Sequence, residues 1–233
     1  MLEHPKEKKT KIRKISFVKN TLIVSGLAAI ITVTLALSMV YGIRISGKKL
    51  PLLILPLTTI GYAAPGAVLG IGILVPLAFF DNWLADQIFV LTRYDTGLIF
   101  TGTAFAIILA YCVRFFSIAQ QTVDGALGRV SPSLPNAARL LGRNKFQVLW
   151  EIYRPLISAS TAAALLLVFV DCVKELPATM LLRPFNFETL ATRVHVQASL
   201  EDLPNAAPGA ILIVLIGLCA VFLLARVTKQ ISH

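Results

Sequence analysis

The sequence predicts an all-α protein with five membrane spans, and two properties of the whole chain point to this class. Of its 233 residues, 56% are hydrophobic and only 15% are charged, whereas a typical soluble domain has about 25% charged residues. Apolar runs of roughly 20 residues, the length that a helix needs to cross a hydrocarbon core, recur along the chain. The net charge of +10 fits basic loops beside lipid headgroups, so membrane lipid rather than nucleic acid is the expected contact.

The chain divides into a basic tail, one transmembrane domain and a short C-terminal tail. Residues 1–20 are rich in lysine and arginine, and we expect them to be mobile or to lie on the membrane surface. The apolar run that follows is too long for a signal peptide and ends in basic residues instead of a small-residue cleavage site. We expect the transmembrane domain over residues 21–226 and the tail over 227–233, with spans at about residues 21–41, 50–80, 97–116, 156–182 and 206–224.

The second predicted span is longer than a straight crossing needs and is interrupted by glycine and proline. The interrupting residues are Pro56, Gly61, Pro65, Gly66, Gly70, Gly72 and Pro76. Because proline removes a backbone donor and glycine loosens a helix, we expect a bent or partly unwound helix here. Two explanations stay open. Such breaks can line a translocation pathway, or the small residues can allow close helix packing, which the spacing of Gly66 and Gly70 favours.

The fourth predicted span carries charges near its outer end. Asp171, Lys174 and Glu175 share one helical face, because they stand at positions i, i+3 and i+4. Ionisable groups at membrane depth are costly and face a bundle interior, an aqueous path or each other. Two interpretations stay open. The charges are structural, with Lys174 paired to Asp171 or with the groups already at the interface, or they form a polar lining for a cation or its gate, with Pro177 opening the helix. Arg114, near the inner end of the third span, is expected to snorkel to the headgroups.

The distribution of lysine and arginine sets the expected orientation, since basic loops stay in the cytoplasm. Basic residues gather after the first span, between the third and fourth spans, and after the fifth: Arg44, Lys48, Lys49, Arg129, Arg139, Arg143, Lys145, Arg154, Arg226 and Lys229. The other two loops contain acidic residues that offset their arginines. Residues 131–155 are therefore expected to face the cytoplasm. The basic N-terminal tail then lies outside, against the rule, and the sequence leaves this conflict open.

Residues 131–155, which we call the elbow, are polar and basic although they stand between two apolar runs. The alanine pair Ala137-Ala138 precedes Gly142, an apolar periodic segment follows, and Pro155 closes it. This pattern predicts a helix, a glycine turn, a second helix and a proline at the start of the next helix. The third helix can run on toward Gly128 before this elbow. A rigid elbow of this kind offers a docking surface.

No catalytic, metal-binding or cofactor-binding pattern stands out in the sequence. The histidines and cysteines are scattered, without disulfide or metal-ligand spacing: His4, His195, His233, Cys112, Cys172 and Cys219. The GxxxxGK[ST] loop that cradles nucleotide phosphates is missing. We therefore expect no permanent metal and no cofactor in this chain, and any ATP-driven work requires another subunit.

The elbow resembles the EAA loop of permease subunits from bacterial ABC importers, in which an alanine pair precedes a glycine and a later proline. The matching residues are Ala137, Ala138, Gly142, Ile152 and Pro155. The departures are Asn136 in place of the usual Glu, Leu149 in place of Phe, and Arg154 in place of Leu. Residues 61–77, 131–142 and 168–194 are similar to permeases of ferric-iron importers. The last block, VFVDCVKELPATMLLRPFNFETLATRV, is the most specific.

This resemblance implies a multi-pass inner-membrane permease with a five-helix core, not an enzyme, that moves ferric iron by alternating access. It implies a cytoplasmic ATPase dimer that binds ATP and docks on the elbow, and a periplasmic or surface-tethered binding protein that delivers substrate. The implied ATPase-coupling residues are Asn136, Ala137, Ala138, Gly142, Ile152 and Pro155. The candidate substrate path comprises Asp171, Lys174, Glu175 and Pro177. Related permeases commonly fuse two such cores, and this chain is similar to the C-terminal one, so a second core is expected, as a homodimer or a separate half.

Several alternatives stay open at this point. An ion-coupled secondary transporter could use Asp171, Lys174 and Glu175, and a scaffold protein would need no pathway. An inactive split half of a permease is a further alternative. Related permeases carry thiamine, sulfate, molybdate or polyamines, so the sequence leaves the substrate undecided.

Overall fold

The computed structural model describes residues 5–46 and 55–229, and within these ranges the chain is helical and contains no strand. Five of its helical stretches are long and apolar enough to cross a membrane: Ser16–Arg44, Gly66–Thr92, Ala104–Gly128, Lys145–Lys174 and Leu203–Val227. The predicted all-α, five-span fold class is confirmed. The long helices are α1 (Pro5–Ser46), α4 (Gly66–Thr92), α5 (Ala104–Gly128), α8 (Arg154–Lys174) and α11 (Leu203–Lys229).

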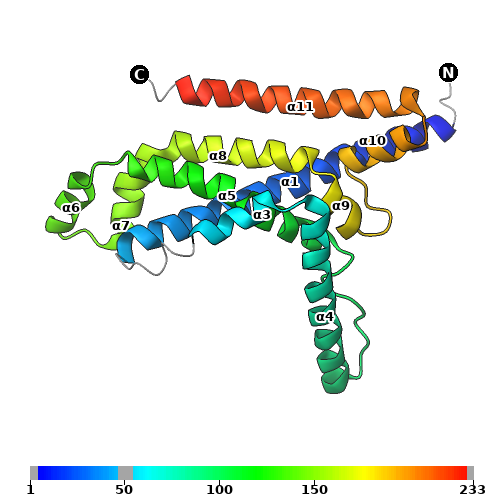
Figure 1. The fold of residues 1–233 in the computed structure, drawn as a ribbon, viewed down its shortest axis with the longest axis horizontal. Coiled ribbons are helices and arrows are strands. Elements are labelled where there is room, and N and C mark those ends of the chain that lie inside the picture. Colours follow the sequence, from blue (N-terminus) through cyan, green and yellow to red (C-terminus); the bar gives the residue numbers. More distant parts are fainter. Residues whose placement is uncertain (1–4, 47–54, 230–233) are drawn as a thin grey trace.

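Helices α1, α5 and α8 pack against one another and form the centre of a bundle, with α11 outside on α8 (Figure 1). Their contact faces consist largely of alanine, and Ala28, Ala36, Ala110 and Ala164 are fully buried. Small side chains let helix backbones approach closely, which is how helices associate in a bilayer, where apolar surface alone gives no driving force. The core of the fold is therefore a tight three-helix contact.

The first helix begins earlier than predicted, because α1 starts at Pro5 and not near residue 21. The basic tail of residues 1–20, expected to be mobile or to lie on the membrane surface, is helical from Pro5 on and continuous with the first span. At 1.5 Å per residue, its 42 residues span about 63 Å, roughly twice the ~30 Å hydrocarbon core. The helix therefore extends well beyond one membrane face.

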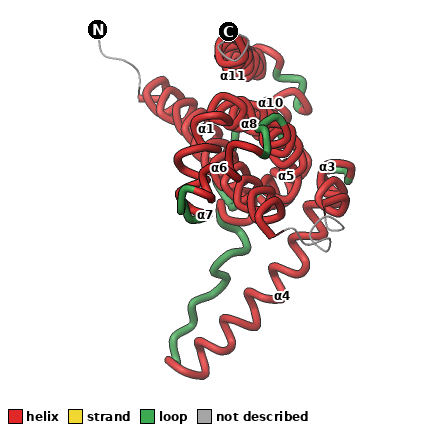
Figure 2. Tube along the Cα trace, turned by 90° about the vertical axis from the view of Figure 1, so that its left-hand side faces the viewer, coloured by secondary structure: helices red, strands yellow, loops and turns green. Residues whose placement is uncertain are grey.

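The second predicted span is broken, as its prolines and glycines indicate. A 3-10 turn, η1 (Leu55–Thr59), leads into α3 (Ile60–Ala63), and α4 starts after Pro65. Residues 50–54 of this prediction lie outside the described residues. Helix α4 includes Pro76 and continues to Thr92, twelve residues past the predicted end at residue 80. It leaves the bundle crosswise, and the following loop returns beside it (Figure 2).

Asp81 explains the late start of the third span. This residue, expected in an external loop, is fully buried on α4. Its carboxylate accepts backbone N–H groups of Ile99, Phe100 and Thr101 at 2.7 to 2.9 Å. These bonds hold residues 97–103 against α4, so α5 begins at Ala104, seven residues later than predicted, and then runs to Gly128 as the sequence allows.

The fourth span is also broken. Helix α8 ends at Lys174, and a short helix α9 (Pro177–Leu182) follows after Glu175 and Leu176. The segment predicted as a polar loop between the fourth and fifth spans contains α10 (Leu190–Ser199), which a reciprocal Thr189–Thr192 capping box starts. Helix α11 extends to Lys229, past the predicted end of the fifth span and into the expected C-terminal tail, whose residues 230–233 lie outside the described residues.

The elbow has the predicted helix–turn–helix form. Helix α6 (Ser133–Leu140) ends before Gly142, whose φ of +82° is a conformation that glycine adopts without strain. Helix α7 (Lys145–Val148) then passes through a π-helical turn, η2 (Leu149–Tyr153), into α8. Sequence reasoning did not predict this π turn.

The elbow, the end of α1 and the end of α11 lie at the same end of the bundle (Figure 1). These are the segments that the basic residues place together, although Lys48 and Lys49 themselves lie outside the described residues. The start of α1 lies at the opposite end (Figure 1). The basic start of α1 and the basic loops therefore lie at opposite ends of the bundle, so the conflict over the orientation stays open.

Candidate functional site

The elbow is fixed to the bundle by a small core of its own. The Tyr41 hydroxyl of α1 donates to the Lys145 carbonyl, and the Tyr41 ring meets Tyr153 edge-on, with centroids 5.4 Å apart. Val148 is fully buried between them and α5. At the same end, Arg44 pairs with Asp124 at 3.0 Å. These contacts fix the elbow to α1, α5 and α8.

The outer face of the elbow is apolar and exposed. Leu140 is 90% exposed and Leu141 is 84% exposed. Ala137 lies exposed on the same short helix, whereas Ala138 is buried in the elbow core. The alanine pair is thus divided: one member faces outward and the other packs inward. Sequence reasoning missed the two leucines, although large apolar residues in a polar loop were a visible signal.

The other elbow residues singled out in the sequence have separate surroundings. Asn136 is exposed, Ile152 packs against the elbow core, and Pro155 occupies the first turn of α8. At Gly142 an added Cβ would meet no atom of this chain within 4 Å. Its positive φ, not crowding inside the chain, is therefore what requires glycine there.

A charged junction lies where the two broken helices meet. Arg114 Nε lies 3.1 Å from Glu175 Oε2, and the Glu175 side chain is only 7% exposed. This N–H is not aligned for a hydrogen bond, so the contact is an ion pair. A second guanidinium nitrogen, Nη1, donates to the carbonyl of Ala64 at 2.8 Å, where α3 ends. The predicted snorkelling of Arg114 is wrong, because α5 runs to Gly128 and leaves Arg114 in the middle of the helix.

Glu175 binds a freed backbone group at the break between α8 and α9, as Arg114 does at the end of α3. Its Oε1 accepts the backbone N–H of Ala178 at 3.3 Å, in the first turn of α9. The Thr179 hydroxyl donates to the Glu175 carbonyl at 2.9 Å and contacts the Tyr111 hydroxyl at 2.6 Å. A broken helix in a membrane needs such partners for its freed backbone groups. One ion pair thus satisfies freed groups at both breaks.

Glycines of the second predicted span allow α3 and α4 to pack closely against α5 and α9 at this junction. A Cβ at Gly66 would lie 2.7 Å from Glu175 Oε1, and one at Gly70 would lie 3.0 Å from Leu181. Gly61 touches the carbonyl of Val113 on α5 so closely that a Cβ would collide with it. At Gly72 an added Cβ would meet nothing within 4 Å. Three of the glycines therefore serve close packing, one of the two explanations that the sequence left open.

The charges of the fourth span divide into two pairs. Lys174 Nζ lies 2.6 Å from Asp171 Oδ1, and the Lys174 side chain is 63% exposed. Glu175 turns away to Arg114. Pro177 starts α9 beside Gly66. In the part of the chain that the structure describes, no group of three or more His, Cys, Asp or Glu residues could hold a metal ion.

The chain resembles known transport proteins over most of its length. Residues 33–233 match the family described as "Binding-protein-dependent transport system inner membrane component". The Haemophilus influenzae "Fe(3+)-transport system permease protein FbpB 2" is 31% identical over 212 residues, which cover 91% of this chain and 39% of that protein. The "Putative 2-aminoethylphosphonate transport system permease protein PhnV" of Salmonella typhimurium is 29% identical over 148 residues, 62% of this chain and 55% of that protein.

A solved structure shares the fold. A chain of the MetNI methionine ABC transporter, in inward facing conformations, superposes with a TM-score of 0.64 at 16% identity, covering 94% of this chain and 96% of that one. The present chain spans less than half the length of the FbpB proteins it matches. The match over residues 33–233 and the five apolar helices agree with each other. The chain therefore belongs to the family of binding-protein-dependent transport system inner membrane components, multi-pass proteins of the bacterial inner membrane.

Proposed function

We propose that the chain is a permease core of an ABC importer and that a separate ATPase dimer drives it by pushing on the elbow. The observation that carries this proposal is the construction of the elbow. It presents exposed Leu140 and Leu141, yet a buried core around Val148 ties it to α1, α5 and α8. An apolar face on a rigid support suits a partner that transmits force. The chain itself binds no nucleotide and hydrolyses none in this proposal.

The proposed contact surface consists of Asn136, Ala137, Leu140 and Leu141, next to the Gly142 turn. Small Ala137 permits close seating of the partner, and the exposed leucines supply apolar area that the partner can bury. Ala138, Ile152 and Pro155 act from the inner side, because they set the position of the elbow on the bundle. Coupling therefore depends on both sets of residues for different reasons.

We propose ferric iron as the cargo. The FbpB relatives bear ferric transport in their names, and the fourth span offers carboxylates, which are hard oxygen ligands suited to a hard cation. Asp171 is the proposed contact, with Lys174 neutralising it between transport events. Glu175, held by Arg114, and Pro177 would act as the gate at the break between α8 and α9. Iron would pass this region without a permanent site.

A second permease core and a substrate-binding protein complete the proposed assembly. Helix α4 projects from the bundle (Figure 1) and exposes large apolar side chains along its length, among them Val68, Ile71, Val75 and Phe79. An exposed apolar face of this size marks a protein or membrane contact. We propose that α4 packs on the second core, either another copy of this chain or a separate half.

Reconstitution tests the proposal directly. Vesicles containing this chain, its second core, the ATPase and the binding protein should take up radioactive ferric iron only when ATP is present. Leu141→Asp should abolish uptake, because a charge in the apolar contact prevents docking. The matched readout is co-purification of the ATPase, which Leu141→Asp should lose while the chain still inserts in the membrane. Uptake driven by an ion gradient without the ATPase would refute the proposal and indicate a secondary transporter. No uptake in either condition would indicate a scaffold protein or an inactive half of a permease.

A phosphonate cargo is the second candidate. The PhnV relatives support it by name, and the exposed ammonium of Lys174 could meet an anion. The same vesicles, supplied with 2-aminoethylphosphonate and the corresponding binding protein, distinguish the two cargoes. If phosphonate is the cargo, these vesicles should take it up and Lys174→Gln should reduce that uptake.

A further inference from the structure

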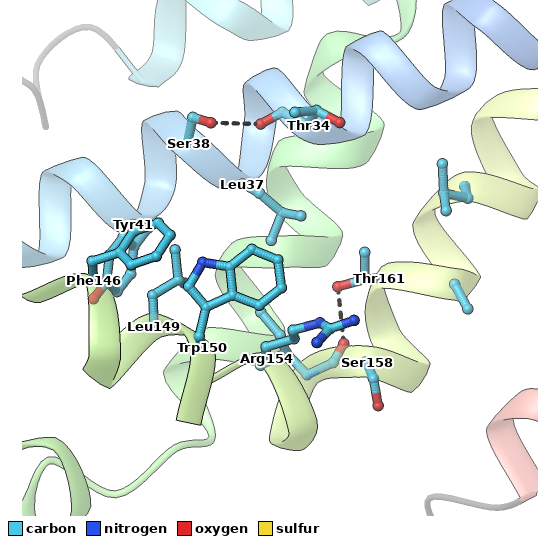
Figure 3. Close-up of a pocket in the computed structure, with 13 residues that line it drawn as sticks. Thr34, Leu37, Ser38, Tyr41, Phe146, Leu149, Trp150, Arg154, Ser158 and Thr161 are labelled. Carbon is cyan, nitrogen blue, oxygen red and sulfur yellow. Dashed lines mark hydrogen bonds between the residues drawn. The ribbon is translucent and has the colours of Figure 1, made fainter. Parts of the chain in front are cut away.

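A groove opens between α1, the elbow and α8, away from the charged junction. Its volume is about 520 Å³, within the ~300–1,000 Å³ range of ligand pockets. Leu37 of α1, Phe146 and Trp150 of the elbow, and Leu165 of α8 form apolar walls. Figure 3 shows the side chains of α1 facing those of the elbow and α8 across this space. The groove is large enough for a ligand and has an apolar lining.

The serine and threonine hydroxyls of the groove are already bonded within their own helices, and the Tyr41 hydroxyl donates to the Lys145 carbonyl. The hydroxyls of Thr34 and Ser38 donate to carbonyls one turn earlier on α1. Those of Ser158 and Thr161 donate to carbonyls of Pro155 and Ile157 on α8. No Asp or Glu lines the groove. A metal cation finds no carboxylate here, so the groove does not fit the proposed cargo.

Arg154 is the charged residue among those that line the groove. Its guanidinium lies 4.6 Å from the centre of the Trp150 ring, and it forms no ion pair with any carboxylate in the described part of the chain. The π-helical turn between Leu149 and Tyr153 carries Trp150 to the groove and leads directly to Arg154. Single π turns of this kind are frequent at functional sites. The groove thus combines apolar walls with one cation and one tryptophan at its elbow end.

We propose that this groove binds one anionic phospholipid from the leaflet on the elbow side. An acyl chain would lie along Leu37 and Leu165, and the phosphate would pair with Arg154. Tryptophan sits at headgroup level in membrane proteins, and basic side chains attract anionic headgroups. This lipid would bridge α1 to the elbow, the part that the ATPase is proposed to move. The lipid site itself does not depend on the identity of the cargo.

Tryptophan fluorescence provides the test, because the chain contains only Trp83 and Trp150. In a Trp83→Phe background, Trp150 becomes the single reporter. The full chain is placed in phosphatidylcholine vesicles with a small fraction of brominated phosphatidylglycerol or, separately, brominated phosphatidylcholine. The anionic lipid should quench Trp150 with about fivefold higher apparent affinity, the size expected for one basic side chain at an anionic surface.

Three variants complete this experiment. Arg154→Gln should abolish the preference, and Arg154→Lys should keep it because the charge remains. The reciprocal Trp150→Phe chain reports from Trp83 on α4 and should show no preference between the two lipids. Equal quenching of Trp150 by both lipids, or an unchanged preference in Arg154→Gln, would overturn the proposal. So would protection of Trp150 from both lipids, which would mean that protein, such as a second copy, covers the groove.

Discussion

Removal of Arg114 should destabilise the protein strongly, because it strands a buried carboxylate. Arg114→Met keeps the length of the side chain and removes the charge. Glu175, 7% exposed, would then lack its counter-ion, and the Ala64 carbonyl at the end of α3 would lose its donor. Breaking a buried pair in this way costs about 3–5 kcal/mol. For a domain of 150–250 residues each kcal/mol is worth about 2–4 °C, so the melting temperature should fall by roughly 10 °C.

The buried cysteines supply the assay. Cys112 and Cys172 are buried, whereas Cys219 is exposed. In a Cys219→Ser background, a thiol-reactive fluorescent dye can react only after the bundle opens, so its signal during heating follows unfolding in detergent. Arg114→Met and the parent chain are compared at equal detergent concentration. This assay needs neither ATPase nor cargo and therefore tests the junction alone.

The double variant separates an ion pair from simple packing. Arg114→Met with Glu175→Met removes both charges, and apolar replacement of a whole buried pair is often neutral. The double variant should therefore melt above Arg114→Met, with a coupling free energy of about 0.5–3 kcal/mol. If Arg114→Met melts within ~2 °C of the parent, less than the shift of one kcal/mol, or if the two single effects simply add, the reasoning about the junction is refuted.

Three further predictions follow from the same contacts. Gly66→Ala should lower the melting temperature, because its Cβ would lie 2.7 Å from Glu175 Oε1 and overpacking costs about 1–3 kcal/mol. The matched variant Gly72→Ala has open space around the added Cβ and should not lower the melting temperature. Equal melting temperatures of the two variants would contradict the packing role of Gly66. Gly142→Asp should leave membrane insertion and ATP hydrolysis intact and abolish uptake in the reconstituted vesicles, where normal uptake would remove the elbow from coupling. Asp171→Asn should lower iron uptake with little change in melting, since its pair with largely exposed Lys174 is worth about 0–1 kcal/mol; unchanged uptake would exclude Asp171 from the path.

The elbow was predictable from the sequence because its signals are local. A glycine with a positive φ, a proline in the first helical turn and a short apolar period each act within a few residues. The division of the alanine pair was not predictable, because it depends on the rotation of α6 against the bundle. Ala138 faces Tyr41 and Val148 only through tertiary packing.

The charged junction lay beyond sequence reasoning for a related reason. The pattern placed Asp171, Lys174 and Glu175 on one face, but it could not show that Arg114, 61 residues earlier in the chain, would take Glu175. Arg114 looked close to a membrane surface because the third span was predicted to end at about residue 116. Helix α5 instead runs from Ala104 to Gly128, which places Arg114 in the middle of the helix. The backbone hydrogen bonds of Asp81 account for the late start of α5, so a non-local contact contributed to this change.

Two uninterrupted helices, α5 and α8, join the elbow to the charged junction, so that a movement of the elbow can be transmitted to the junction. Helix α5 supplies Val123 and Leu127 to the elbow core and Arg114 to the junction. Helix α8 supplies Ile157 to the elbow core and ends directly before Glu175. Neither helix contains a proline between these points, so neither has the usual cause of a sharp kink. Because a tilt of the elbow reaches the junction as a tilt of both helices, the breaks beside Ala64 and Glu175 are where the chain can bend in response.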